Sequence, residues 1–129
     1  MKRHLLLGLL LLVTVLTMAQ KPVAKFTTYT HDFGTIKEED GKVSFTFDFT
    51  NEGKSDLLLT DVKASCGCTT PKWSKKPIAP GKKGMIEVTY NAKNRPGPFS
   101  KTITITNNSE EEKILIYIKG EVIPKPKKQ

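Results

Sequence analysis

The stretch Val43-Ser44-Phe45-Thr46-Phe47-Asp48-Phe49-Thr50 alternates strictly between large apolar and polar residues. Successive side chains of an extended strand point to opposite faces, so this stretch places four large apolar groups on one face. The pattern is typical of a strand that buries one side against a second layer. A cofactor-stacking role for the phenylalanines is the weaker interpretation, because a sandwich core needs the same apolar stripe.

Other stretches of the chain show related patterns. Alternation is clear in residues 85–90, 99–106 and 114–122, and shorter strands are expected at residues 25–28, 31–36 and 57–62. Gly34 suggests a bulge, and Pro80-Gly81 fits the centre of a type II turn. Residues 23–123 therefore predict an all-β, immunoglobulin-like β-sandwich of about seven antiparallel strands, with a small closed barrel as the alternative.

The alternation also predicts which side chains form the core. The most buried are expected to be Phe45, Phe47, Ile86, Val88, Ile103, Ile105, Ile116 and Ile118. Leu115 and Tyr117 lie on the opposite face from the isoleucines beside them, which predicts a last strand that is covered on both faces.

The two ends of the chain differ from the predicted domain. Lys2 and Arg3 precede an apolar run over residues 5–16, which is too short for a comfortable membrane span. Thr17 and Ala19 then supply a small residue at each of the two positions that a signal peptidase reads. Residues 1–19 are thus a predicted signal peptide, with an uncleaved anchor as the alternative. We expect an exported protein, periplasmic or extracellular, without a transmembrane segment after cleavage. Residues 124–129 predict a solvated basic Pro/Lys tail.

The positive charge of the chain, formally +8, is concentrated in one segment. Residues 62–84 contain no acidic residue and six lysines: Lys63, Lys72, Lys75, Lys76, Lys82 and Lys83. Such a surface attracts polyanions. Lys72, Lys75 and Lys76 are the predicted contacts to an acidic surface polymer, lipid headgroups or another envelope protein. A merely soluble loop region is the alternative, and export argues against nucleic acid.

The only cysteines form the sequence Cys66-Gly67-Cys68. In an extended strand their Cα atoms would lie about 6.6–7 Å apart, at the upper limit for a disulfide, whereas a turn at Gly67 would allow closure. So short a loop adds only about 1–2 kcal/mol to stability in the chain-entropy model. Three interpretations stay open: an inert buried or bridged pair, a Cu(I) site, and a redox-active pair that is accessible to partners.

Four motifs resemble a known family: His31-Asp32-Phe33-Gly34, Asn51-Glu52-Gly53, Ser65-Cys66-Gly67-Cys68-Thr69-Thr70-Pro71 and Pro77-Ile78-Ala79-Pro80-Gly81-Lys82-Lys83-Gly84. Residues 26–122 resemble the bacterial family called domain of unknown function 1573. The resemblance implies an immunoglobulin-like sandwich, related in shape to pilus-chaperone and major-sperm-protein-like domains, in an exported protein. It implies no activity and no catalytic residue.

No motif in the chain indicates an enzyme. There is no supported Ser-His-Asp arrangement, no glycine-rich phosphate loop and no spaced set of cysteines and histidines. No cofactor is expected, with Cu(I) as the alternative. The sequence predicts an exported immunoglobulin-like module with an interaction or structural role at the cell envelope. The alternative is a periplasmic thiol-redox or Cu(I)-handling protein acting through Cys66 and Cys68.

Overall fold

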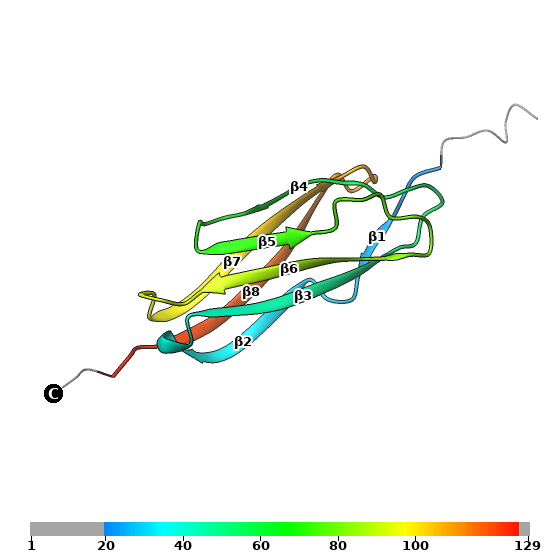
Figure 1. Ribbon diagram of the computed structural model, residues 1–129. Helices are drawn as coiled ribbons and strands as arrows, with labels where there is room; N and C mark the ends of the chain where they lie inside the picture. Colours follow the sequence, from blue (N-terminus) through cyan, green and yellow to red (C-terminus); the bar gives the residue numbers. More distant parts are fainter. Residues whose placement is uncertain (1–19, 127–129) are drawn as a thin grey trace, which may run out of the picture.

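The computed structural model describes residues 20–126, in which two four-stranded sheets pack face to face (Figure 1). The predicted signal peptide and the last three residues of the predicted tail lie outside the described residues. The first sheet has the order β1 (Ala24–Phe26), β3 (Lys42–Asn51), β6 (Lys83–Asn91) and β5 (Thr69–Trp73). The second has the order β2 (Thr30–Lys37), β8 (Lys113–Ile123), β7 (Gly97–Asn107) and β4 (Leu59–Ala64). The predicted all-β sandwich is confirmed.

The strand count and one pairing differ from the prediction. There are eight strands in the described chain, and β2 pairs with β8 in parallel, whereas every other pair of neighbouring strands is antiparallel. Residues 24–37 form two strands, β1 and β2, which lie in different sheets and so frame one side of the sandwich. A single 3-10 turn, η1 (Glu38–Asp40), follows β2. No helix within residues 20–126 has the length and apolar character of a membrane span.

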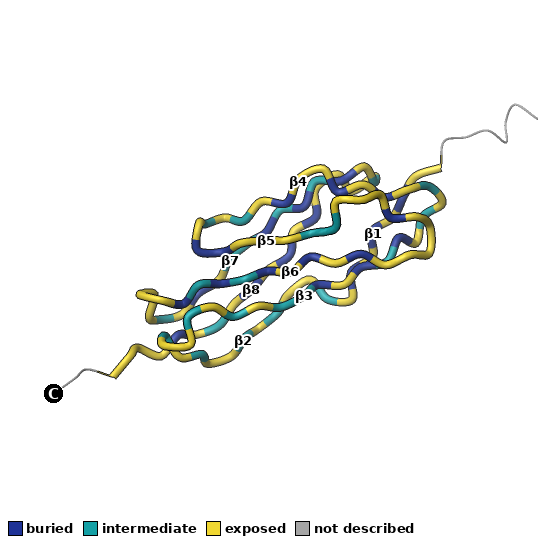
Figure 2. The backbone as a smooth tube through the Cα atoms, in the orientation of Figure 1, coloured by how far each residue is buried: buried dark blue, intermediate teal, exposed yellow. Residues whose placement is uncertain are grey.

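The core lies between the sheets and largely contains the predicted residues (Figure 2). Seven of the eight residues expected to be most buried have 0% exposure: Phe47, Ile86, Val88, Ile103, Ile105, Ile116 and Ile118. Phe45 is the exception and is only partly buried. Its ring stacks on His31 of β2, with 3.7 Å between ring centroids and 5° between planes, at the side of the sandwich where β2 is the edge strand.

The prediction that β8 is covered on both faces is wrong. Leu115 and Tyr117 point outward and are 43% and 36% exposed. A two-layer sandwich buries only the inner face of each sheet, so an apolar residue on the outer face stays in contact with solvent. The isoleucines of β8 form the buried face as expected.

Two local predictions from glycine positions are confirmed. Gly34 has a φ of 69°, and the register of β2 against β8 shifts between Asp32 and Thr35, as a bulge requires. Gly81 has a φ of 80°, and the Lys82 amide donates to the Ala79 carbonyl over 3.0 Å. These are the features of a type II turn with Pro80 and Gly81 at its centre.

Candidate functional site

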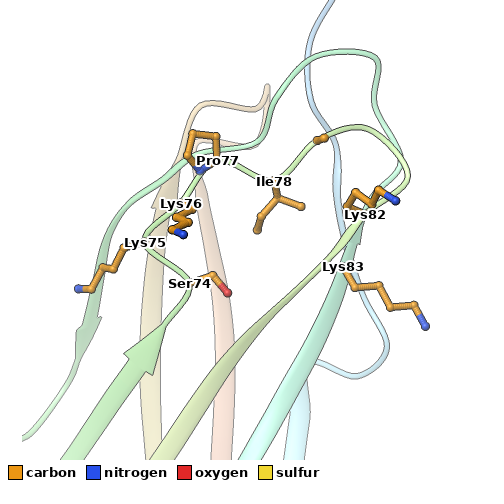
Figure 3. A pocket seen from close by; sticks show the side chains of 8 residues that line it. Ser74, Lys75, Lys76, Pro77, Ile78, Lys82 and Lys83 are labelled. Carbon is orange, nitrogen blue, oxygen red and sulfur yellow. The ribbon is translucent and has the colours of Figure 1, made fainter.

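Four lysines from the β5–β6 connection and the first residue of β6 surround one open hollow at the end of the first sheet (Figure 3). This basic hollow has a volume of about 600 Å³ and is lined by Ser74, Lys75, Lys76, Pro77, Ile78, Ala79, Lys82 and Lys83. Lys75 and Lys76 extend on one side of Ile78, and Lys82 and Lys83 on the other (Figure 3). The first pair follows β5 and the second leads into β6, so the β5–β6 connection brings both pairs together.

The lysines of the basic hollow have no local counter-charge. Its lining contains no acidic residue, and within residues 20–126 the only ion pair joins Lys25 to Glu52, over 4.0 Å. The Lys75 ammonium lies 3.1 Å from the centroid of the Trp73 ring, a cation–π contact. This contact covers one face of the indole and orients Lys75. The positive charge of the hollow is therefore available to a ligand from outside.

The fully buried side chain of Asn51 holds the loop that shapes the basic hollow. Its amide nitrogen donates to the carbonyls of Ile78 and Ser55, over 2.8 Å each. Its Oδ1 accepts from the backbone amides of Gly53 (2.9 Å) and Val23 (3.2 Å). Every donor and acceptor of this side chain is thus used, which is what a buried amide requires.

Backbone contacts complete this support. The Asn51 amide donates to the Lys82 carbonyl over 2.9 Å, and the Gly81 amide donates to the Asn51 carbonyl over 2.7 Å. Below the loop, Gly84 leaves space for Ile78, because a Cβ at that position would collide with the side chains of Ile78 and Phe49. The predicted strand ended at Thr50, so the sequence prediction missed the role of Asn51. Its position two residues after Phe49 continues the inward period of β3, and this is the signal that could have found it.

The structure separates Lys72 from the other two predicted polyanion contacts. Lys75 and Lys76 line the basic hollow, whereas Lys72 lies on the outer face of the first sheet, opposite Glu87 of β6. There it lines a second hollow, the polar hollow, of about 490 Å³, together with Lys42, Gly67, Cys68, Thr70, Glu87, Thr89 and Asn91. Lys72 thus lies on the outer face of β5, whereas Lys75 and Lys76 lie in the loop that follows this strand.

Cys66 and Cys68 form a disulfide in the turn that connects β4 to β5, across the edge of the sandwich. Their Cα atoms are 5.3 Å apart, and the Thr69 amide donates to the Cys66 carbonyl over 3.2 Å. The backbone is therefore turned at Gly67, and the extended alternative with two separate thiols does not apply. This turn and the β5–β6 connection, which lines the basic hollow, lie at opposite ends of β5 (Figure 1).

The surroundings of the two sulfurs differ. Cys66 is half-buried, whereas Cys68 is 5% exposed and belongs to the core. The Cys68 amide donates to the Cys66 Sγ over 3.0 Å, and the Cys68 Sγ lies 3.5 Å from the Thr69 hydroxyl. Opposite Thr69, burial raises the pKa of Tyr90, against a smaller opposing effect of the Arg95 charge. Both cysteines would be accessible in a redox-active pair, but only Cys66 is partly exposed to solvent.

Other potential metal ligands do not gather at the disulfide. His31 is on β2, at the opposite edge of the second sheet from β4, and Met85 pairs with the far end of β5. No group of three or more His, Cys, Asp or Glu side chains suited to a metal ion occurs in the described part of the chain. Cys66 and Cys68 would have to be reduced before they could offer thiolates.

The edge strand β5 was not predicted as a strand. In its antiparallel pairing with β6, Cys68 and Ser74 hydrogen-bond to Asn91 and Met85, so the backbone groups of Pro71 point away from β6. Proline therefore costs β5 no ladder bond, and it removes a donor from the free edge, which discourages pairing with another chain.

Comparison with known proteins places the chain in a family. The model of the family "Protein of unknown function (DUF1573)" matches residues 24–122. A protein of unknown function from Porphyromonas gingivalis W83 has a similar structure, with 21% identity and a TM-score of 0.71. The match covers 84% of this chain and 50% of that one, so this chain spans half the length of the Porphyromonas protein.

Two further structures share the fold at low identity. The PapD-like domain 7 of human CEP192 is 8% identical, with a TM-score of 0.66 and coverage of 85% of this chain and 93% of that one. The secreted serine protease VesC from Vibrio cholerae is 14% identical, with a TM-score of 0.54 over 85% of this chain and 24% of that one. No curated protein matches the sequence. The family model covers most of the described chain, and the chain therefore belongs to the DUF1573 family of proteins of unknown function.

Proposed function

We propose that this protein is an exported, non-enzymatic binding module of the cell envelope that holds acidic polymers through the basic hollow. The observation that carries the proposal is the grouping of Lys75, Lys76, Lys82 and Lys83 around one hollow whose lining has no acidic residue. Lysines grouped in this way raise the local concentration of polyanions and attract them electrostatically. The predicted signal peptide supports a location outside the cytoplasm, where acidic glycans occur.

The shape of the site favours a flexible chain over a flat membrane. The lysines stand on both sides of Ile78, and apolar and small residues form the surface between them (Figure 3). A polymer can enter such a hollow and place successive carboxylates near both lysine pairs. A planar bilayer would contact only the outermost ammonium groups.

Charge reversal on both sides of the hollow tests this function. We expect Lys76→Glu with Lys82→Glu to weaken binding to alginate about 10- to 100-fold at low salt. Each exposed charge contact contributes roughly 0.2–1 kcal/mol, and each reversal replaces an attraction by a repulsion. Isothermal titration calorimetry at two salt concentrations measures the effect, which should shrink as salt screens the charges.

The matched control carries the same change of net charge elsewhere. Lys93 and Lys119 are exposed and lie outside the basic hollow. Lys93→Glu with Lys119→Glu should reduce alginate affinity far less than the hollow variant. Equal losses in the two variants would show a general charge effect, and tighter binding to phosphatidylglycerol vesicles than to alginate would favour a membrane partner. Either outcome overturns the proposal.

A second candidate function is thiol–disulfide exchange at Cys66 and Cys68, which a specific observation favours. The disulfide closes a loop of only three residues, whose middle residue, Gly67, is exposed, and so short a loop adds little to stability. Cu(I) handling is a variant of this candidate that depends on prior reduction. Cys66→Ser with Cys68→Ser is expected to shift the midpoint of urea unfolding only slightly. A loss above about 3 kcal/mol would assign the disulfide a structural role instead.

A further inference from the structure

We propose that Cys66 is the sulfur through which the disulfide exchanges with a partner dithiol, and that Cys68 is the resolving sulfur. This assignment rests on the second candidate function, thiol–disulfide exchange. It adds the direction of attack and a division of roles between the two cysteines. Three features of the turn between β4 and β5 carry it: access, hydrogen bonding to each sulfur, and the order in which bonds can break.

Access differs between the two sulfurs. A thiolate that opens a disulfide must reach the attacked sulfur, in line with the bond that breaks. Cys66 is half-buried and is followed by the exposed Gly67, around which an added Cβ would meet no atom within 4 Å. Cys68 contributes to one wall of the polar hollow, yet it is only 5% exposed and packs in the core. Access therefore favours attack on Cys66.

Hydrogen bonding also distinguishes the two positions. The Cys68 amide donates to the Cys66 Sγ over 3.0 Å. After reduction the same N–H would donate to a thiolate on Cys66, and charge-assisted bonds of this kind stabilise the anion. The Cys68 Sγ has the Thr69 hydroxyl at 3.5 Å, which can donate to the sulfur that leaves during the first step.

The exchange balances with one dithiol partner. The partner thiolate attacks the Cys66 Sγ, so that a partner–Cys66 bond forms, the Cys66–Cys68 bond breaks, and the electron pair leaves on Cys68, which takes up a proton. The second partner thiolate then attacks the partner's own sulfur in the mixed disulfide and releases Cys66 as a thiolate. The partner is oxidised by two electrons, and the Cys66–Cys68 pair is reduced to two thiols. In the reverse direction, Cys68 resolves a mixed disulfide held on Cys66.

Single-cysteine variants test the assignment. Cys68→Ser leaves the Cys66 thiol alone, and Cys66→Ser leaves the Cys68 thiol alone. We expect the Cys68→Ser protein to form a mixed disulfide with oxidised glutathione at least about tenfold faster than the Cys66→Ser protein, because exposure controls thiol reactivity. Intact-mass spectrometry follows the adduct over time, and circular dichroism of both variants confirms that each is folded.

Wild-type protein separates failure of the assignment from failure of the candidate function. Native protein is treated with dithiothreitol and then alkylated, and two added alkyl groups report reduction. A wild-type disulfide that resists reduction without denaturant refutes exchange as a function, and the assignment with it. If the wild-type disulfide is readily reduced, the candidate function stands and the variants decide the assignment. The assignment is then overturned if Cys66→Ser reacts as fast as or faster than Cys68→Ser, or if neither variant reacts.

Discussion

Phe47→Ala is expected to lower the free energy of unfolding by about 3–5 kcal/mol. The Phe47 side chain has 0% exposure and lies on β3 opposite Ile86 of β6, which is equally buried. Its ring also meets Phe45 edge-on, with centroids 4.9 Å apart. Truncation would leave a cavity between the sheets in addition to the lost burial. Urea unfolding followed by fluorescence of Trp73, the single tryptophan, measures the change.

Phe45→Ala is the matched comparison for this variant. Phe45 has the same chemistry on the same face of the same strand, but it is only partly buried and packs against His31 at the side of the sandwich. Its truncation should cost roughly 1–2 kcal/mol, because much of the vacated space opens to solvent. If Phe45→Ala lowered the free energy of unfolding as much as Phe47→Ala or more, the core would not be centred on Phe47 as described.

Asn51→Asp is expected to destabilise the protein by roughly 3–5 kcal/mol at neutral pH. The substitution keeps the shape and the acceptor that serves Val23 and Gly53, but it turns a carboxylate oxygen toward the carbonyls of Ile78 and Ser55. Two hydrogen bonds are lost, and the buried carboxylate has no positively charged partner. Affinity for alginate should fall as well, because the loop of the basic hollow loses its support.

The pH dependence of this variant provides a second readout. Burial and the facing carbonyls would raise the pKa of the new carboxyl above its unfolded value of about 3.9. The protonated form is then the better tolerated one, so the deficit relative to wild type should shrink as pH falls toward 4 and reach its full size above the raised pKa. Asn94→Asp, on an exposed loop, is the control and should change stability little. A pH-independent deficit, or a loss below 1 kcal/mol, would contradict the role given to Asn51.

Period-two patterning was enough to predict most of the core. In β3, β6, β7 and β8 the burial of each side chain follows directly from its parity along the strand. Parity also extends to residues just beyond the ends of the predicted strands. Asn51 follows Phe47 and Phe49 on the inner face, and Asn107 follows Ile103 and Ile105 in the same way and is 3% exposed. Each buried asparagine ends a long strand and donates to a carbonyl of the loop beyond it, Ser55 for Asn51 and Glu111 for Asn107.

Features that depend on contacts distant in sequence were harder to predict. The parallel pairing of β2 with β8 joins residues near the two ends of the domain, and no local pattern encodes it. Patterning also fails to distinguish a covered outer face from an exposed one, which is why Leu115 and Tyr117 were misplaced. The charged segment was identified in the sequence, but the β5 strand that divides its lysines between two hollows was hidden by Pro71 and the cysteine motif.

The most direct test of the proposed function is a map of the binding surface in solution. Two-dimensional amide NMR of the labelled protein, titrated with a short alginate oligosaccharide, reports on all backbone amides at once, which excludes only the prolines. The proposal predicts that the shifts concentrate at Lys75, Lys76, Lys82 and Lys83 and at the loop between them, and that they diminish with added salt. Shifts centred on the outer face of β8, or on Cys66 and Cys68, or no saturable shifts at low salt, would contradict it.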